Sequence, residues 1–158
     1  MDAVTLLKKQ HREVEALFKE LENTDDAAGR RELMGQIREM LEMHTSIEEE
    51  IFYPAVREVE TKKAEMMVLE AYEEHHVVDL VLKDMPNVDP EDERFEAKMT
   101  VLKELVEHHV EEEEKEMFKL AQKLGKEELR EIGERMLGQI PEEMRGEMET
   151  KKRGRRAA

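Results

Sequence analysis

Two pairs of residues with the same spacing could bind metal ions. His44 and Glu48 are four residues apart, and so are His109 and Glu113. Residues four apart share one face of an α-helix, so each pair would present an imidazole beside a carboxylate. The chain has no cysteine, and nitrogen and oxygen ligands without sulfur suit non-haem iron, with manganese or zinc less favoured. The two pairs therefore predict a metal site built from imidazoles and carboxylates.

Two further histidines repeat this pattern. His11 precedes His44 by 33 residues, and His75 precedes His109 by 34. The chain thus reads as two helical hairpins of one design, each with a lone histidine followed by a His-x-x-x-Glu pair. Two carboxylates from facing helices can bridge two metal ions while the imidazoles fill terminal positions. We therefore expect a dinuclear site.

Composition and periodicity predict that helices position these residues. Charged residues make up 42% of the chain and aromatic residues only 4%, with abundant Glu, Lys, Leu and Met, which is typical of an all-helical protein. Short connections between the helices favour an up-down-up-down four-helix bundle. Pro54 is expected to kink the second helix or to end its regular part, and Asp89 to cap the fourth with proline at its first position. The four helices are expected over residues 2–22, 28–59, 62–84 and 90–124.

Each of these helices carries a histidine at the centre of its apolar stripe. At about 100° per residue, four histidines fall among the apolar residues of their own helix: His11, His44, His75 and His109. His76 is displaced toward the edge of the stripe, and His108 points well off it. One buried histidine is usually a core residue with a satisfied hydrogen bond, but four in one bundle are harder to attribute to chance. Burying imidazoles and carboxylates without compensation costs roughly several kcal/mol per charged group, and a metal ion compensates directly.

The chain divides into a bundle, an extension and a tail. The bundle is expected over residues 1–124. After Gly125 the segment KEELREIGERMLGQI is amphipathic, so residues 125–144 are expected to add a short fifth helix as a C-terminal extension. Residues 145–158 contain KKRGRR and are expected to fray into a flexible basic tail, with an interaction tail as the alternative.

The charge and the N-terminal residues limit the partners and the location. A formal net charge of −15 opposes nucleic acid or an anionic membrane as the main partner. The first residues, MDAVTLLKKQ, lack the apolar run of a signal peptide, and no stretch approaches about 18 consecutive apolar residues. We therefore expect a cytoplasmic protein that acts on small molecules.

Three segments carry a resemblance to a known family: HTSIEEEIFYP from His44, EEHHVVDLVL from Glu73 and EHHVEEEEKEMF from Glu107. With the lone histidine of the first helix, they resemble the hemerythrin-like family, also called the HHE cation-binding domain, over roughly Leu6 to Leu124. Ferritin-like di-iron bundles are the nearest competitor, but they use Glu-x-x-His pairs, three residues apart.

The resemblance implies a di-iron centre in the core of the bundle. The ligands that it implies are His11 and His44 on one iron ion, His75 and His109 on the other, and Glu48 and Glu113 as bridges. A solvent-derived oxygen, as an oxo or hydroxo group, would complete the bridge.

The chain departs from the oxygen carriers of this family at Asp79. Those proteins have a second histidine one turn after the third-helix histidine, which is His75 here. As a ligand, Asp79 would favour ferric iron over reversible oxygen binding. Alternatively, Asp79 only orients a ligand and leaves a position open for peroxide or water. Glu15 poses the same ambiguity beside His11.

Two other assignments stay open. Glu114 rivals Glu113 as the fourth-helix ligand, because hemerythrins place this carboxylate five residues after its histidine. Tyr72 lies near the third-helix stripe and could donate a hydrogen bond to the centre, but we favour an amphipathic core residue.

These observations together predict a non-haem di-iron protein that reacts with hydrogen peroxide or dioxygen. The Asp79 substitution favours an oxidoreductase with catalase-like peroxide decomposition. A non-catalytic module that binds or senses iron, oxygen or nitric oxide is the alternative, and a structural bundle with an adventitious zinc site is a third.

Overall fold

The computed structural model describes residues 1–145, and every regular element in that range is a helix. The prediction of an all-helical protein is confirmed. The elements are α1 (Ala3–Glu22), α2 (Ala27–Ile47), η1 (Glu48–Phe52), α3 (Tyr53–Arg57), α4 (Lys62–Asp84), η2 (Met85–Asn87), α5 (Glu93–Glu112), η3 (Glu113–Met117), α6 (Phe118–Ala121), η4 (Gln122–Leu124) and α7 (Lys126–Gln139). Of the short elements, η1 and η3 are π-helical, whereas η2 and η4 are 3-10 turns.

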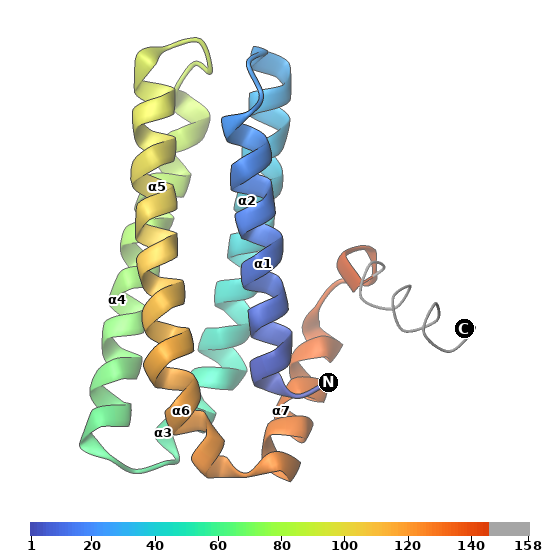
Figure 1. The fold of residues 1–158 in the computed structure, drawn as a ribbon, viewed down its shortest axis with the longest axis vertical. Helices are drawn as coiled ribbons and strands as arrows, with labels where there is room; N and C mark the ends of the chain where they lie inside the picture. Colours follow the sequence, from blue (N-terminus) through green and yellow to red (C-terminus); the bar gives the residue numbers. More distant parts are fainter. Residues whose placement is uncertain (146–158) are drawn as a thin grey trace.

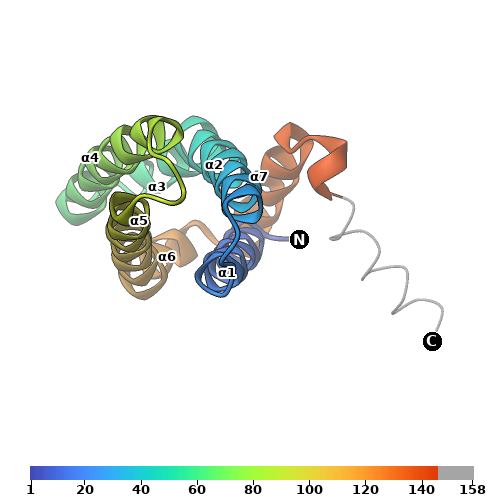
Figure 2. The same ribbon diagram turned by 90° about the horizontal axis from the view of Figure 1, so that it is seen from above.

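Four long helices, α1, α2, α4 and α5, stand side by side and form the body of the molecule (Figure 1). Viewed from above, they surround a common centre (Figure 2). The α1–α2 and α4–α5 connections lie at the upper end in Figure 1, whereas α3, α6 and α7 lie at the lower end. Side chains from all four helices can therefore meet inside the bundle.

The start of α5 differs from the sequence prediction. Asp92, and not Asp89, caps this helix, and its side chain accepts a hydrogen bond from the backbone N–H of Arg94. Asp89 instead accepts from the N–H of Glu91 within the preceding turn. A side-chain acceptor satisfies one of the free N–H groups of a first helical turn, so the helix begins where that acceptor stands.

The second and fourth predicted helices are not regular throughout. The second is divided into α2, η1 and α3, and the fourth contains η3 after α5. In a π-helical segment, backbone hydrogen bonds join residues that are five apart, whereas in an α-helix they join residues that are four apart. The side chains that follow such a segment therefore face directions that an α-helical period does not predict.

The buried apolar residues form two separate clusters. One gathers the start of α1, the residues around η1 and α3, the first half of α4, and α6 and α7; the other gathers the later part of α1, α2, the end of α4 and α5. Where the chain passes from one cluster to the other, it carries the buried polar residues of the described chain. They are Gln10, His11, His44, Glu48, His75, His109 and Glu113.

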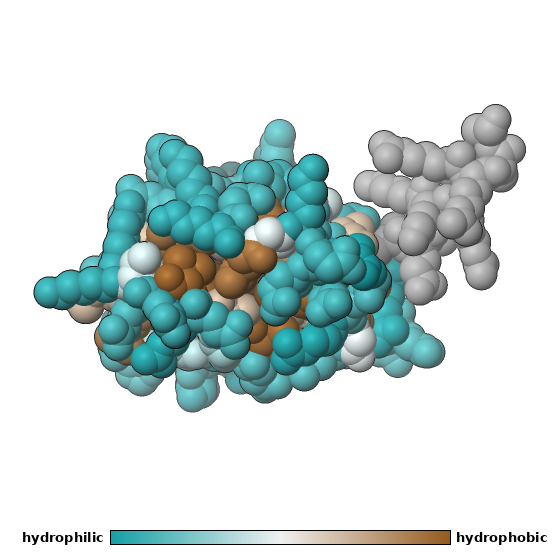
Figure 3. Space-filling view, turned by 90° about the horizontal axis from the view of Figure 1, so that it is seen from below, coloured by the Kyte–Doolittle hydropathy of each residue, from teal (hydrophilic) through white to brown (hydrophobic). Residues whose placement is uncertain are grey.

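The C-terminal helix α7 lies within the predicted extension and packs against the start of α1. At Gly133 an added Cβ would lie 2.2 Å from the carbonyl oxygen of Met1, so this approach requires glycine. Seen from the end where α3, α6 and α7 lie, the surface is mostly hydrophilic, with a hydrophobic patch near its middle (Figure 3).

Two expectations concern other parts of the chain. Residues 146–158, which hold almost all of the predicted basic tail, lie outside the described residues. Within residues 1–145, no helix is long and apolar enough to cross a membrane.

Candidate metal centre

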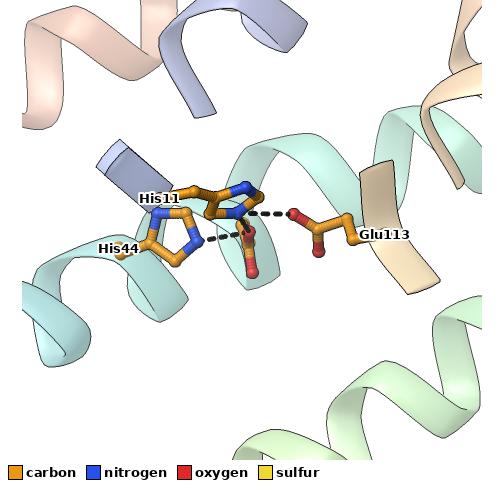
Figure 4. A group of neighbouring side chains, drawn as sticks. His11, His44 and Glu113 are labelled. Carbon is orange, nitrogen blue, oxygen red and sulfur yellow. Dashed lines mark ion pairs between the residues drawn. The ribbon is translucent and has the colours of Figure 1, made fainter. Parts of the chain in front are cut away.

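The four histidines and two glutamates predicted as ligands meet in the core from six different elements. They come from α1 (His11), α2 (His44), η1 (Glu48), α4 (His75), α5 (His109) and η3 (Glu113). Each has an exposed fraction of 7% or less. Figure 4 shows three of them, His11, His44 and Glu113, converging from separate helical segments. The polar layer between the two apolar clusters is thus a group of possible ligands.

His11 and His44 form one side of this group, which we name the first half-site. The Nε2 atom of His44 lies 2.7 Å from Oε1 of Glu48, and the Nε2 atom of His11 lies 3.2 Å from Oε1 of Glu113. The two imidazole rings stand edge to face, with centroids 5.0 Å apart. Ligand atoms of these four residues lie within 4.8 Å of one another, close enough to hold one metal ion.

His75 and His109 form the second half-site, on the other side of the same carboxylates. The Nε2 atom of His75 lies 3.0 Å from Oε2 of Glu48, and the Nε2 atom of His109 lies 3.2 Å from Oε2 of Glu113. Glu48, His75 and His109 also offer ligand atoms within 4.8 Å of one another. Each carboxylate therefore turns one oxygen toward each half-site, which is the arrangement of a bridging ligand.

Both carboxylates stand at the first residue of a π-helical segment. Glu48 begins η1, and its carbonyl accepts from the N–H of Tyr53; Glu113 begins η3, and its carbonyl accepts from the N–H of Phe118. Single π turns inside α-helices are rare and are frequent at functional sites. Because the bonded residues are five apart, Tyr53 and Phe118 come to face the centre with their glutamates.

Tyr53 is fully buried, and its hydroxyl lies among the atoms of the second half-site. The hydroxyl is 2.8 Å from Oε2 of Glu48 and 2.8 Å from Oε2 of Glu113, either of which can accept its proton. It is also 3.1 Å from Nε2 of His75 and 3.3 Å from Nε2 of His109. Burial and the negative charges of Glu113 and Glu48 raise the pKa of Tyr53 well above its ordinary value, so without a bound cation it is a neutral phenol. Tyr53 was not among the residues predicted for the centre from the sequence.

Opposite charges stabilise one another in the centre. Burial by itself raises the pKa of Glu48, but the charge of His44 and hydrogen bonds from the imidazoles outweigh burial and hold that pKa well below its usual range. Burial by itself lowers the pKa of His109, but hydrogen bonds to Glu113, Glu48 and Glu74 raise that pKa well above its usual value. The centre therefore favours a positive charge among its carboxylates.

Several buried atoms of the centre have no hydrogen bond of normal geometry. They are Nδ1 and Nε2 of His11, Nε2 of His44, Oε1 of Glu48, Nδ1 of His75 and Oε1 of Glu113. Leaving a buried polar group unpaired costs about 1–3 kcal/mol, so this many in one place indicates a site that binds something. The donors are nitrogen and oxygen without sulfur, the set that suits iron. The residues present therefore fit a metal centre.

Asp79 is not part of the centre, contrary to the expectation from the sequence. Its Oδ2 atom lies 2.7 Å from Nζ of Lys83, and its side chain is 41% exposed. At about 100° per residue, Asp79 falls at the edge of the buried arc of α4, past His75 and turned toward solvent. Since α4 is a regular α-helix throughout, nothing rotates this carboxylate inward.

The structure also separates the competing glutamates. Glu113 lies in the centre, whereas Glu114 binds the guanidinium of Arg12, with 2.6 Å between Oε2 and the nearer nitrogen. Glu114 still lies 3.7 Å from Nδ1 of His11 and so stands behind that ring. Glu15 binds Arg12 at 2.7 Å on the surface, outside the centre.

The remaining candidates point elsewhere. Tyr72 donates to the backbone carbonyl of Glu49 at 3.2 Å and not to the centre. That carbonyl lies one turn before Pro54, which has no N–H to donate to the preceding turn. His76 and His108 are both exposed.

A cavity of about 20 Å³ adjoins the four imidazoles. Apart from the imidazoles, Gln10 and Thr45, its lining is hydrophobic: Val14, Met40, Leu41, Val78, Val106 and Val110. A space of roughly 10–15 Å³ measured in this way holds one water molecule. The cavity therefore admits a molecule of only a few atoms.

Comparison with known proteins gives a family match and two similar proteins. The family model described as Hemerythrin HHE cation binding domain matches residues 2–121. A protein of Nostoc sp. named DNA nickase is 30% identical over 118 residues; the match covers 75% of this chain but 33% of the Nostoc protein, so the chain spans about a third of that relative. The crystal structure of a hemerythrin HHE cation binding domain-containing protein from Mycobacterium kansasii is similar with a TM-score of 0.79 and 26% identity, over 97% of this chain and 93% of that chain.

Proposed function

The chain belongs to the hemerythrin HHE cation-binding family, and from this premise we propose that it is a non-haem di-iron protein that reacts with hydrogen peroxide or dioxygen. The observation that carries the proposal is that Glu48 and Glu113 each turn one oxygen toward either half-site. Two such carboxylates with two pairs of imidazoles exceed the needs of one ion. They match the bridging and terminal ligands of a dinuclear centre.

The side chains divide into terminal and bridging ligands. His11 and His44 would hold one ion. His75, His109 and the oxygen of Tyr53 would hold the other, with the two glutamates between them. Iron bound there would supply redox chemistry and Lewis acidity toward a small oxidant.

We assign to Tyr53 the role expected for Asp79, the preference for ferric iron. A phenolate oxygen is an anionic donor, and tyrosine is the ligand to haem iron in catalases. The raised pKa of Tyr53 means that its proton stays in place until a cation displaces it. We therefore place peroxide decomposition, of catalase-like type, ahead of reversible oxygen carriage.

A module that binds or senses dioxygen or nitric oxide is the second candidate. The cavity of about 20 Å³ beside the imidazoles supports it, because its size suits a diatomic molecule and its lining is mainly hydrophobic.

We propose neither a nucleic acid nor a membrane as partner. The nickase activity in the name of the Nostoc relative belongs to a protein of which this chain spans about a third. A net charge of −15 also repels the phosphates of DNA.

The test uses iron-loaded, oxidised protein. We expect two iron ions per chain by elemental analysis and release of dioxygen when hydrogen peroxide is added. Tyr53→Phe should slow that release, whereas Tyr72→Phe should not, because the Tyr72 hydroxyl bonds to a backbone carbonyl. One iron ion or none would contradict the dinuclear proposal. Reversible oxygenation without peroxide turnover would favour the second candidate.

A further inference from the structure

The two hairpins place equivalent residues around the two half-sites, but the equivalent residues are not the same. Three positions occur in each hairpin. The first comes directly before the lone histidine (His11 or His75). The second comes directly after the glutamate of the centre (Glu48 or Glu113), and the third comes five residues after that glutamate. The three equivalent pairs are Gln10 and Glu74, Glu49 and Glu114, and Tyr53 and Phe118. Each pair contacts the imidazoles, so each difference acts on a possible ligand.

The first pair differs in charge. The Oε1 atom of Gln10 lies 2.6 Å from Nδ1 of His44, and this amide is fully buried. At the equivalent place, the Oε1 atom of Glu74 lies 3.4 Å from Nδ1 of His109. A neutral amide therefore stands behind the first half-site, and a carboxylate stands behind the second.

The second pair has the same residue type but a different environment. Glu49 lies 3.6 Å from Nδ1 of His75, and Glu114 lies 3.7 Å from Nδ1 of His11. The guanidinium of Arg12 binds Glu114 and offsets part of its charge. Among residues 1–145, no lysine or arginine forms an ion pair with Glu49. Arg12 is shared with Glu15, so the negative charge is partly compensated behind the first half-site and, within the described chain, has no such partner behind the second.

The third pair differs in the group that faces the ligands. The hydroxyl of Tyr53 reaches the second half-site, 3.1 Å from Nε2 of His75. The ring of Phe118 stacks parallel to the ring of His11, with centroids 6.0 Å apart and 3° between the planes. Phe118 offers no oxygen to the first half-site.

We propose that the second half-site, His75 and His109, binds its metal ion more tightly than the first and is filled first. Carboxylates behind imidazole ligands raise their basicity and attract the cation, and such outer partners typically change metal affinity by about 10–100-fold. All three differences act in the same direction. The inference rests on the proposed dinuclear centre and adds to it the order in which the two positions load.

The test is an anaerobic titration of the metal-free protein with cobalt(II), in which binding is monitored by visible absorption and by calorimetry. We expect two equivalents, the first bound at least about tenfold more tightly than the second. His109→Ala should remove the tight step. His44→Ala should remove the weak step and leave the tight one.

Charge-neutralising variants test the cause without removing a ligand. Glu74→Gln should weaken the tight step by about tenfold and leave the weak step unchanged. Glu70→Gln is the matched control, because it makes the same change on an exposed position of the same helix, one turn earlier. Gln10→Glu should strengthen the weak step.

The outcomes separate this inference from the proposed function. Binding of a single cobalt ion in total would contradict the dinuclear centre itself. Two ions of equal affinity, or loss of the tight step in His44→Ala, would overturn the order of loading and leave the dinuclear centre standing. An unchanged tight step in Glu74→Gln would show that the outer carboxylate is not its cause.

Discussion

The hydroxyl of Tyr53 lies 2.8 Å from Oε2 of Glu48, the residue five positions earlier in the chain. In a regular α-helix, residues five apart face directions about 140° from each other, and such a contact is out of reach. The π-helical segment η1 removes this separation, because its hydrogen bonds join residues five apart. A local change of backbone thus brings a phenol to a carboxylate of the candidate centre.

Tyr53→Phe tests whether that phenol becomes a ligand. We expect the ferric protein to lose the broad visible absorption that phenolate-to-iron charge transfer produces, and to keep both iron ions. Absorption spectra with elemental analysis on the same sample measure this. Tyr72→Phe serves as the control and should keep the absorption. A visible spectrum unchanged by Tyr53→Phe would mean that the phenol never coordinates iron.

Histidine substitutions test which imidazoles are ligands. His44→Ala and His109→Ala should each lose bound iron, because each removes a buried Nε2 atom that faces Glu48 or Glu113. His76→Ala and His108→Ala should retain it, since both side chains are exposed. Iron counted by elemental analysis decides the matter. If His108→Ala loses iron and His109→Ala keeps it, then His108 and not His109 faces the centre, and the rotation of α5 described above is wrong by one residue.

Asp79→Ala tests the correction to the sequence prediction. Its carboxylate forms an exposed ion pair with Lys83, so we expect a change in unfolding free energy within about 0.5 kcal/mol. Iron content and peroxide turnover should equal those of the parent protein. Loss of iron on this substitution would show that Asp79 is a metal ligand after all.

Acid should weaken metal binding at the second half-site. The pKa of His109 lies well above its usual value in the metal-free protein, so the ring still holds a proton at pH values where an ordinary imidazole has lost it. A metal ion must displace that proton, and affinity therefore falls as pH decreases. The fall should begin above about pH 6.5, the ordinary pKa of histidine. Cobalt titrations over a pH series, with proton release measured by calorimetry in two buffers, test this. An affinity that stays constant down to about pH 6.5 would contradict it.

The sequence predicted most of the helical scaffold because its apolar residues keep an α-helical period. The third helix, expected over residues 62–84, corresponds to α4 (Lys62–Asp84). Family membership and the all-helical class are confirmed. The histidines on the apolar stripes also meet in the core, because a residue in phase with buried neighbours is buried with them.

The same period explains what the sequence did not reveal. Tyr53 follows His44 by nine positions, and at about 100° per residue it should point to the opposite side of the helix. The period holds only up to Glu48, where η1 begins. One signal was available: in both hairpins the glutamate is followed five residues later by an aromatic residue, Tyr53 in one and Phe118 in the other.

The division of the core into two apolar clusters has a consequence for the cooperativity of unfolding. Between the clusters stands a layer of imidazoles and carboxylates, several of them without hydrogen-bond partners. Bound metal ions would join α1, α2, α4 and α5 across that layer, so the loaded protein should melt in a single transition and well above the metal-free form. Without metal, the long helices still run through both clusters and Tyr53 still bonds Glu48 and Glu113, so calorimetry should show a lower and broader transition than that of the loaded protein. One sharp transition in both forms, at the same temperature, would contradict this. Bound metal would then make the two hydrophobic clusters unfold more cooperatively than the shared helices do alone.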